Sequence, residues 1–141
     1  MPAKVFIDTN ILIYAYSITE LDKRNITFTI LESYSIVISV QVINEFIWIM
    51  NRKFNINYDK LEVLVDRFWE KFEVSLINKF TIQKALKIAQ DYKYSYWDSL
   101  IIASALENKC SILFTEDMQD DQVIEGRLRI KNPYASPLPR P

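Results

Sequence analysis

Short apolar runs alternate with amphipathic stretches along the chain, and this pattern predicts strands and helices in turn. The segment KVFID at residues 4–8 is an unbroken apolar run ending in an acid, which is typical of a strand buried on both faces of a parallel sheet. SIVISV at 35–40 and SILFT at 111–115 are rich in β-branched residues and predict two more strands. Further strands are expected at 73–77 and, after a turn at Gly126, at 128–131.

Helical spacing of apolar residues fills the segments between these strands. Four helices are expected over residues 21–34, 41–53, 59–72 and 97–107. Two more are expected after candidate N-cap residues, one after Asn10 and one after Thr81. Strands alternating with helices predict an α/β fold, a three-layer α/β/α sandwich around a mostly parallel sheet. We expect one domain over residues 1–132. The proline-rich tail, residues 133–141, should run extended along the surface or fray.

The helix expected over residues 41–53 is apolar almost all round, in contrast to the clean stripe of 59–72. One helical face cannot hold all of its apolar side chains. It is therefore either buried in the core of the monomer or pressed against another chain, a second copy or a partner protein.

Composition excludes several kinds of chemistry. The 141 residues include no His, one Gly and one Cys, and the formal net charge is −1. The absence of His removes Ser-His-Asp and Cys-His catalysis and His-based zinc sites, and a single Gly cannot build a phosphate-binding glycine loop. Cys110 is expected to be a small buried apolar residue. No strongly basic footprint for nucleic acid is present, so carboxylates are the main reactive groups left.

The chain shows neither a signal-peptide pattern at its start nor an apolar stretch of the roughly 18 residues that cross a bilayer. We therefore expect a soluble, cytoplasmic protein.

Four acids are expected to meet at one edge of the sheet, where the carboxyl ends of parallel strands gather. Asp8 closes the first strand, and Glu45 lies one turn into the helix after the second. Asp98 opens the helix before SILFT, and Asp117 follows that strand. Like charges so close together repel and need a cation. Glu45 is the most informative of them, because it is the only charge between Ser33 and Met50.

Each acid also has an ordinary structural explanation. Glu45 could form a buried ion pair with Lys or Arg. Asp8 and Asp98 could cap or stabilise the first turns of helices. The acidic loop could be a solvated turn; its members are Glu116, Asp117, Asp120, Asp121 and Glu125. Convergence of four acids on one edge is what favours a metal site.

Four segments resemble the PIN-domain nucleases, most closely the VapC-type toxins of toxin–antitoxin pairs. They are VFIDTNILIY at 5–14, SVQVINEF at 39–46, YWDSLIIASA at 96–105 and LFTEDMQDDQVIEGRLRIKNPY at 113–134. They follow the order of the family along the whole chain. The resemblance implies that the metal-binding and catalytic acids are Asp8, Glu45, Asp98 and Asp117.

The resemblance further implies a Mg²⁺- or Mn²⁺-dependent, single-strand-directed endoribonuclease, the toxin of a toxin–antitoxin pair. It implies a homodimer and a cognate antitoxin whose C-terminal segment lies across the active-site cleft. Thr9 or Asn10, and Thr115, match positions that orient acids or water, while the roles of Asp120 and Asp121 stay open. Metal-activated water, rather than the 2′-OH, would attack the phosphate and leave a 5′-phosphate. Basic side chains that could hold phosphates near this edge are Lys23, Arg24, Arg52 and Lys53.

Three other readings remain open. A phosphorylatable receiver domain would need an acidic neighbour beside Asp8 and a lysine after Thr115, and this chain has neither. A metal-dependent phosphatase on small molecules would need an aspartate where Asn10 stands. A non-catalytic PIN-like interaction module would use the same acids to bind a cation or a basic partner.

Overall fold

The computed structural model describes residues 2–135, so residues 136–141 of the predicted tail lie outside the described part. The strands are β1 (Lys4–Ile7), β2 (Ser35–Ser39), β3 (Glu73–Ser75), β4 (Ile112–Phe114), β5 (Val123–Ile124) and β6 (Leu128–Lys131). The helices are α1 (Thr9–Tyr14), α2 (Leu21–Ser33), α3 (Val40–Phe54), α4 (Tyr58–Lys71), α5 (Lys79–Tyr92) and α6 (Tyr96–Glu107). The predicted α/β class is confirmed.

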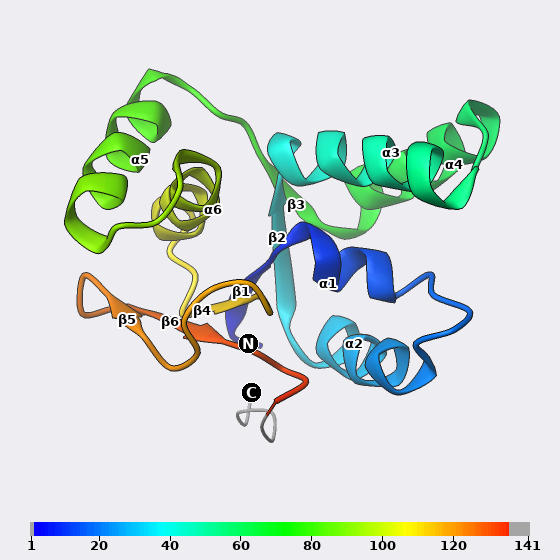
Figure 1. Ribbon diagram of the computed structural model, residues 1–141, viewed down its shortest axis with the longest axis horizontal. Helices are drawn as coiled ribbons and strands as arrows, with labels where there is room; N and C mark the ends of the chain where they lie inside the picture. Colours follow the sequence, from blue (N-terminus) through cyan, green and yellow to red (C-terminus); the bar gives the residue numbers. More distant parts are fainter. Residues whose placement is uncertain (1, 136–141) are drawn as a thin grey trace.

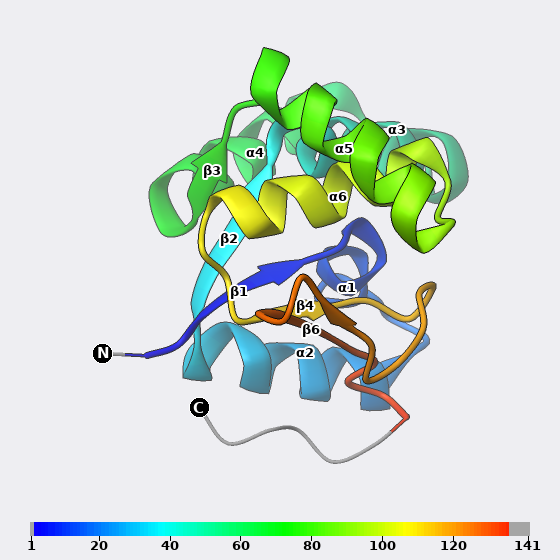
Figure 2. The ribbon, with the colours of Figure 1, turned by 90° about the vertical axis from the view of Figure 1, so that its left-hand side faces the viewer.

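The six strands form one sheet in the order β3-β2-β1-β4-β6-β5. All neighbours are parallel except β5, which pairs antiparallel with β6. Figure 1 shows α5 and α6 together on one side of β1 and β2, with α3 and α4 on the other. Figure 2 shows α6 and α2 on opposite sides of β1 and β4. Helices therefore cover both faces, as a parallel sheet requires.

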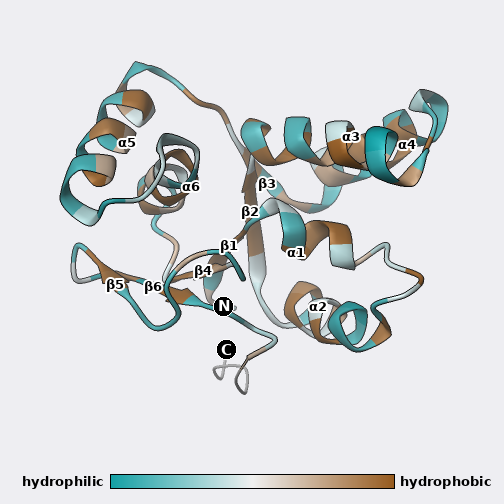
Figure 3. Cartoon of the chain, viewed as in Figure 1, coloured by the Kyte–Doolittle hydropathy of each residue, from teal (hydrophilic) through white to brown (hydrophobic). Residues whose placement is uncertain are grey.

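The central strands are almost wholly apolar because both of their faces are covered. Val5, Phe6 and Ile7 of β1 have no exposed surface. Figure 3 shows the hydrophobic colour running along β2 beside them. Cys110 is buried at the edge of the same core, as predicted, and burial raises the pKa of its thiol to about 12.

Core packing explains most of the apolar surface of α3. Phe46 is fully buried, and its ring meets the ring of Phe68 from α4 edge-on with centroids 4.9 Å apart. The Tyr16 ring packs against Phe46 at 5.6 Å. Trp48 and the last residue of the helix, Phe54, are exceptions, because they are 61% and 46% exposed. Burial within the monomer thus accounts for the apolar side chains of this helix other than Trp48 and Phe54.

Two predicted helix caps are wrong. Helix α1 is capped by Asp8 rather than Asn10, and α5 is capped by Asn78 rather than Thr81. Thr81 is instead the fourth residue of a capping box: the Asn78 side chain accepts from the Thr81 amide, and the Thr81 hydroxyl accepts from the Asn78 amide. The reciprocal bonds satisfy two amides at once, so the helix begins two residues before the predicted cap.

Candidate metal centre

Asp8 lies where β1 ends and α1 begins, and it is 8% exposed. Its amide donates to the carbonyl of Phe114, which fixes it beside the end of β4. One carboxylate oxygen accepts from the Thr9 amide at 2.7 Å, and the other accepts from the Thr115 hydroxyl at 2.8 Å. Asp8 therefore caps α1, which was one of the explanations considered for it. The two hydrogen bonds, one to each carboxylate oxygen, fix the orientation of its side chain.

Glu45 stands on the first turns of α3, half-buried, facing the start of α6. Gln41, one turn earlier, donates from its side-chain amide to the carbonyl of Trp97 at 3.2 Å and so ties α3 to α6. The Glu45 Oε1 atom is buried and has no hydrogen-bond partner among the described residues. A buried carboxylate oxygen without a partner is costly and calls for a cation or a proton.

Asp98 belongs to the first turn of α6. The helix is capped by Ser95, whose hydroxyl accepts from the Asp98 amide at 3.1 Å. The carboxylate of Asp98 thus sits near the positive end of the helix, which stabilises an acid there. The Gln41 contact to the neighbouring Trp97 carbonyl holds this turn beside α3.

Asp117 follows β4 and is the most exposed of the four. Its carboxylate accepts from the side-chain amide of Asn10 at 2.9 Å, and its backbone amide donates to the Thr115 hydroxyl at 3.2 Å. The Thr115 hydroxyl therefore contacts two of the acids: it donates to the Asp8 carboxylate and accepts from the Asp117 backbone amide. The orienting roles suggested for Asn10 and Thr115 match these contacts.

Electrostatic repulsion links the four acids in a chain. Burial, followed by weaker repulsion from Glu45 and Asp98, raises the pKa of Asp8 to about 6, although its two hydrogen bonds act the other way. The pKa of Glu45 is raised by burial and then by Asp98, against a hydrogen bond from Gln41. The pKa of Asp98 is raised by burial and then by Asp117. The structure thus brings the predicted acids to one sheet edge.

The ion-pair explanation is not supported. Over residues 2–135, none of the four acids forms a salt bridge with a Lys or Arg. The acidic loop behaves differently, because Asp121 and Asp120 both face the Lys131 ammonium, at 2.9 and 3.7 Å. These two acids of the β4–β5 loop therefore pair with β6 and do not belong to the cluster.

The four carboxylates do not form a compact cluster. In the described part of the chain, no three of them are arranged closely enough to hold a metal ion by themselves. Their chemistry nevertheless fits one, since hard oxygen donors suit Mg²⁺ or Mn²⁺ and Glu45 has an unpartnered oxygen. Mg²⁺ commonly keeps several waters, so a wider spacing of acids is compatible with binding.

Lys23, predicted to hold phosphates, is already engaged. Its ammonium contacts the Glu116 carboxylate at 3.0 Å and lies over the Tyr14 ring at 4.6 Å. Tyr14 also donates to Glu116, and its ring meets Tyr134 edge-on at 5.2 Å. This network braces the residue next to Asp117. Neither this network nor the role of Gln41 was predicted from the sequence. The available signal for Gln41 was a polar residue in an apolar segment, one helical turn before an isolated acid.

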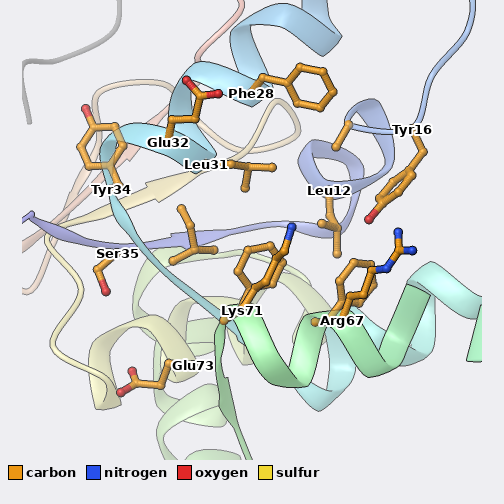
Figure 4. Close-up of a pocket in the computed structure, with 14 residues that line it drawn as sticks. Leu12, Tyr16, Phe28, Leu31, Glu32, Tyr34, Ser35, Arg67, Lys71 and Glu73 are labelled. Atoms are coloured by element: carbon orange, nitrogen blue, oxygen red, sulfur yellow. The ribbon is translucent and has the colours of Figure 1, made fainter. Parts of the chain in front are cut away.

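Two cavities lie between the helices, and only one of them is next to the acids. One of about 900 Å³ opens beside Glu45 and is lined by Val40, Gln41, Asn44, Glu45, Trp48, Ile77, Trp97 and Leu100. The other, of about 640 Å³, lies between α1, α2 and α4, with Arg67 and Lys71 along one wall and Glu32 across from them (Figure 4). None of the four acids lines the second cavity, so it is separate from the candidate metal centre.

The fold is thus a mostly parallel α/β sandwich whose four acids lie near the carboxyl ends of the strands, the edge at which such sheets bind ligands. Residues 5–123 match the model of the PIN domain, and the chain belongs to this family. The resemblance seen in the sequence is confirmed. No curated protein matches the chain.

Solved structures share the fold. A toxin–antitoxin complex from Klebsiella pneumoniae superposes with a TM-score of 0.69 at 23% identity, covering 92% of this chain and 98% of that one. VapBC2 from Rickettsia felis, bound to a DNA fragment from its promoter, gives 0.64 at 17% identity, covering 92% and 99%. VapC20 from Mycobacterium tuberculosis, a sarcin–ricin-loop-cleaving toxin, gives 0.65 at 15% identity, covering 80% and 91%.

Across residues 2–135, no helix has the length and apolar character needed to span a membrane.

Proposed function

We propose that this chain is a Mg²⁺- or Mn²⁺-dependent endoribonuclease directed at single-stranded RNA, the VapC-type toxin of a toxin–antitoxin pair. The observation that carries the proposal is the cluster of four carboxylates at one edge of a PIN domain, without a Lys or Arg neutralising any of them among residues 2–135. Burying an unpaired carboxylate costs on the order of several kcal/mol unless an opposite charge or hydrogen bonds offset it. Helix capping offsets part of that cost for Asp8, but the buried Oε1 atom of Glu45 has no partner among the described residues.

Asp8, Glu45 and Asp98 would hold the cation directly or through water, and Asp117 would complete the site. When bound, a divalent cation would act as a Lewis acid, lowering the pKa of a water molecule that it binds and neutralising charge on the phosphate. The chain contributes orientation: Thr115 fixes one oxygen of Asp8, and Asn10 fixes Asp117. With no His in the chain, attack by water is the route we favour, leaving 5′-phosphate and 3′-hydroxyl ends.

Incubating the protein with total RNA and Mn²⁺, then mapping the cut ends, tests this proposal. We expect cleavage that EDTA abolishes and that Asp8→Asn removes, with 5′-phosphate ends. Asp91→Asn is the matched control, because Asp91 is an exposed acid paired with Lys87 on α5. Undiminished cleavage in EDTA and by Asp8→Asn would end the proposal. Mn²⁺ raising the melting temperature with no RNA cut would favour the non-catalytic interaction module.

A cognate antitoxin is part of the proposal, supported by toxin–antitoxin complexes among the solved structures of the same fold. Control of an RNA-cleaving toxin by such a partner also fits a cytoplasmic location. For a homodimer, the surface we favour is the β3–α5 connection together with the first turn of α5, where Leu76 and Phe80 are 67% and 71% exposed. Light scattering should give twice the chain mass; a monomer at every concentration would contradict it.

A further inference from the structure

The β4–β5 loop, residues 115–122, carries Asp117 and is held from outside by a tyrosine hydroxyl. The Tyr94 hydroxyl accepts from the backbone amide of Gln119 at 3.1 Å, two residues after Asp117. The same hydroxyl donates to the side-chain oxygen of Gln122 at the end of the loop. Tyr94 therefore uses its hydroxyl group in both directions to hold this loop.

Tyr94 also stands immediately before the helix that carries Asp98. Lys93 ends α5 with a left-handed backbone, at φ 65°, and the chain turns there toward α6. Ser95, the residue after Tyr94, is the N-cap of α6, and its hydroxyl accepts from the Asp98 amide at 3.1 Å. The Tyr94 ring is half-buried and packs against the main core, which restricts its movement. A short path of bonded residues thus leads from the β4–β5 loop to Asp98.

This path joins two pairs of acids that are otherwise linked separately. The Thr115 hydroxyl links Asp8 to Asp117. Gln41 ties α3 to α6, the helices that carry the other two acids. Burial and then repulsion from Asp117 raise the pKa of Asp98, so one acid of each pair acts on the other. Like charges push their two segments apart, and the bonds of Tyr94 hold the same two segments together.

We propose that Tyr94 is a positioning residue for the metal centre: its hydroxyl fixes the β4–β5 loop against the start of α6 and so sets the separation of Asp117 from Asp98. Its two hydrogen bonds go to glutamines, so Tyr94 acts through the backbone that carries the acids. Mg²⁺ demands near-octahedral geometry, and a site binds best when its ligands are held at the right separation beforehand. This inference rests on the proposed function, because it concerns the metal centre assigned there.

Tyr92 offers a matched control two residues earlier in the chain. Its ring is also half-buried against the main core, and its hydroxyl also accepts from a backbone amide, that of Glu125 at 3.0 Å. Glu125 lies in the β5–β6 turn, where β6 begins, whereas the acids gather where the parallel strands end. Tyr92→Phe therefore removes a similar bond far from the edge that carries the acids.

Calorimetric titration of the RNA-free protein with Mn²⁺ tests the proposal without cleavage. Tyr94→Phe should weaken Mn²⁺ binding by about 3- to 10-fold, less than the roughly 10- to 100-fold typical of groups that contact a metal ligand directly. Tyr92→Phe should bind Mn²⁺ as tightly as the wild type. Thermal melts in EDTA should show that both variants are folded, with similar small losses of melting temperature.

Two further measurements separate positioning from a general loss of structure. If Tyr94 acts through Asp117, adding Tyr94→Phe to Asp117→Asn should weaken Mn²⁺ binding no further. In the RNA assay, Tyr94→Phe should need more Mn²⁺ for half-maximal cleavage, and at saturating Mn²⁺ it should regain the kcat and KM of the wild type. A further loss of affinity in the double variant, or a raised KM for RNA, would contradict the positioning role.

Equal Mn²⁺ affinities of the wild type and folded Tyr94→Phe would overturn the proposal, and so would an equal loss in Tyr92→Phe. Failure of the nuclease gives a different result. Mn²⁺ binding that depends on Tyr94, without any RNA being cut, would keep the positioning role and reject the nuclease. Mn²⁺-dependent cleavage with an affinity independent of Tyr94 would do the reverse. A wild type that binds no Mn²⁺ would overturn both.

Discussion

Replacing Asp8 by asparagine should stabilise the metal-free protein increasingly as pH rises. The pKa of Asp8 is raised from 3.8 to about 6, chiefly by burial. An acid whose pKa is higher in the folded state binds its proton more tightly there, so folding is favoured at low pH. The stability linked to this proton is fully present below pH 3.8 and is lost as pH rises through about 6. The asparagine side chain is never ionised, so the variant avoids this loss.

The size of the effect follows from the shift. One pKa unit corresponds to 1.36 kcal/mol, so the full penalty on the wild type at neutral pH is about 3 kcal/mol. About half of it, roughly 1.4 kcal/mol, develops between pH 5 and pH 7.5. Asparagine accepts only through its oxygen, so the bond with the Thr115 hydroxyl must reverse direction or be lost. Any cost of this change is the same at every pH and does not alter the trend.

Urea unfolding in EDTA, followed by tryptophan fluorescence across this pH range, measures the effect. The unfolding free energy of Asp8→Asn minus that of the wild type should rise by about 1.4 kcal/mol from pH 5 to 7.5. Asp91→Asn, at an exposed position, is the control and should show no such rise. Mn²⁺ at the upper pH should stabilise the wild type and leave Asp8→Asn unchanged. A difference that stays flat with pH would refute the reasoning from burial.

Three further substitutions probe the packing and the orienting contacts. Phe46→Ala removes a fully buried ring and should lower the unfolding free energy by about 3–5 kcal/mol in urea; a loss below about 1 kcal/mol would contradict the core described. Asn10→Ala removes the amide that holds Asp117 and should reduce Mn²⁺ affinity by about 10- to 100-fold in calorimetry, whereas an equal affinity would remove Asn10 from the site. Tyr134→Phe loses the 2.8 Å hydroxyl contact with Thr27 and should cost about 1 kcal/mol in a thermal melt, and an unchanged melting temperature would show that contact to be idle.

The sheet could be predicted because its central strands are buried on both faces and therefore read as continuous apolar runs. β1, β2, β4 and β6 were expected within a residue or two of their observed bounds. β5 was missed, since Val123–Ile124 is too short to carry a pattern. Its antiparallel pairing with β6 comes from the turn at Gly126, whose φ of 70° suits glycine.

The edge on which the acids gather could also be predicted, because strand direction fixes where each strand ends. The arrangement of side chains could not. Spacing along the chain does not tell whether three carboxylates face one point, and here they form a looser chain of repulsions. Nor does periodicity reveal that Gln41 reaches the Trp97 carbonyl, a contact between helices 56 residues apart in sequence. Such contacts depend on how α3 and α6 pack, which only the folded chain determines.

The position of Mn²⁺ in crystals of the protein tests the metal centre most directly. Anomalous scattering should reveal a peak bounded by Asp8, Glu45 and Asp98, with Asp117 on its open side, and Asp8→Asn crystals should lose it. Crystals saturated with Mn²⁺ that show no peak among these carboxylates, or a peak held by other residues, would contradict the assignment of the four acids.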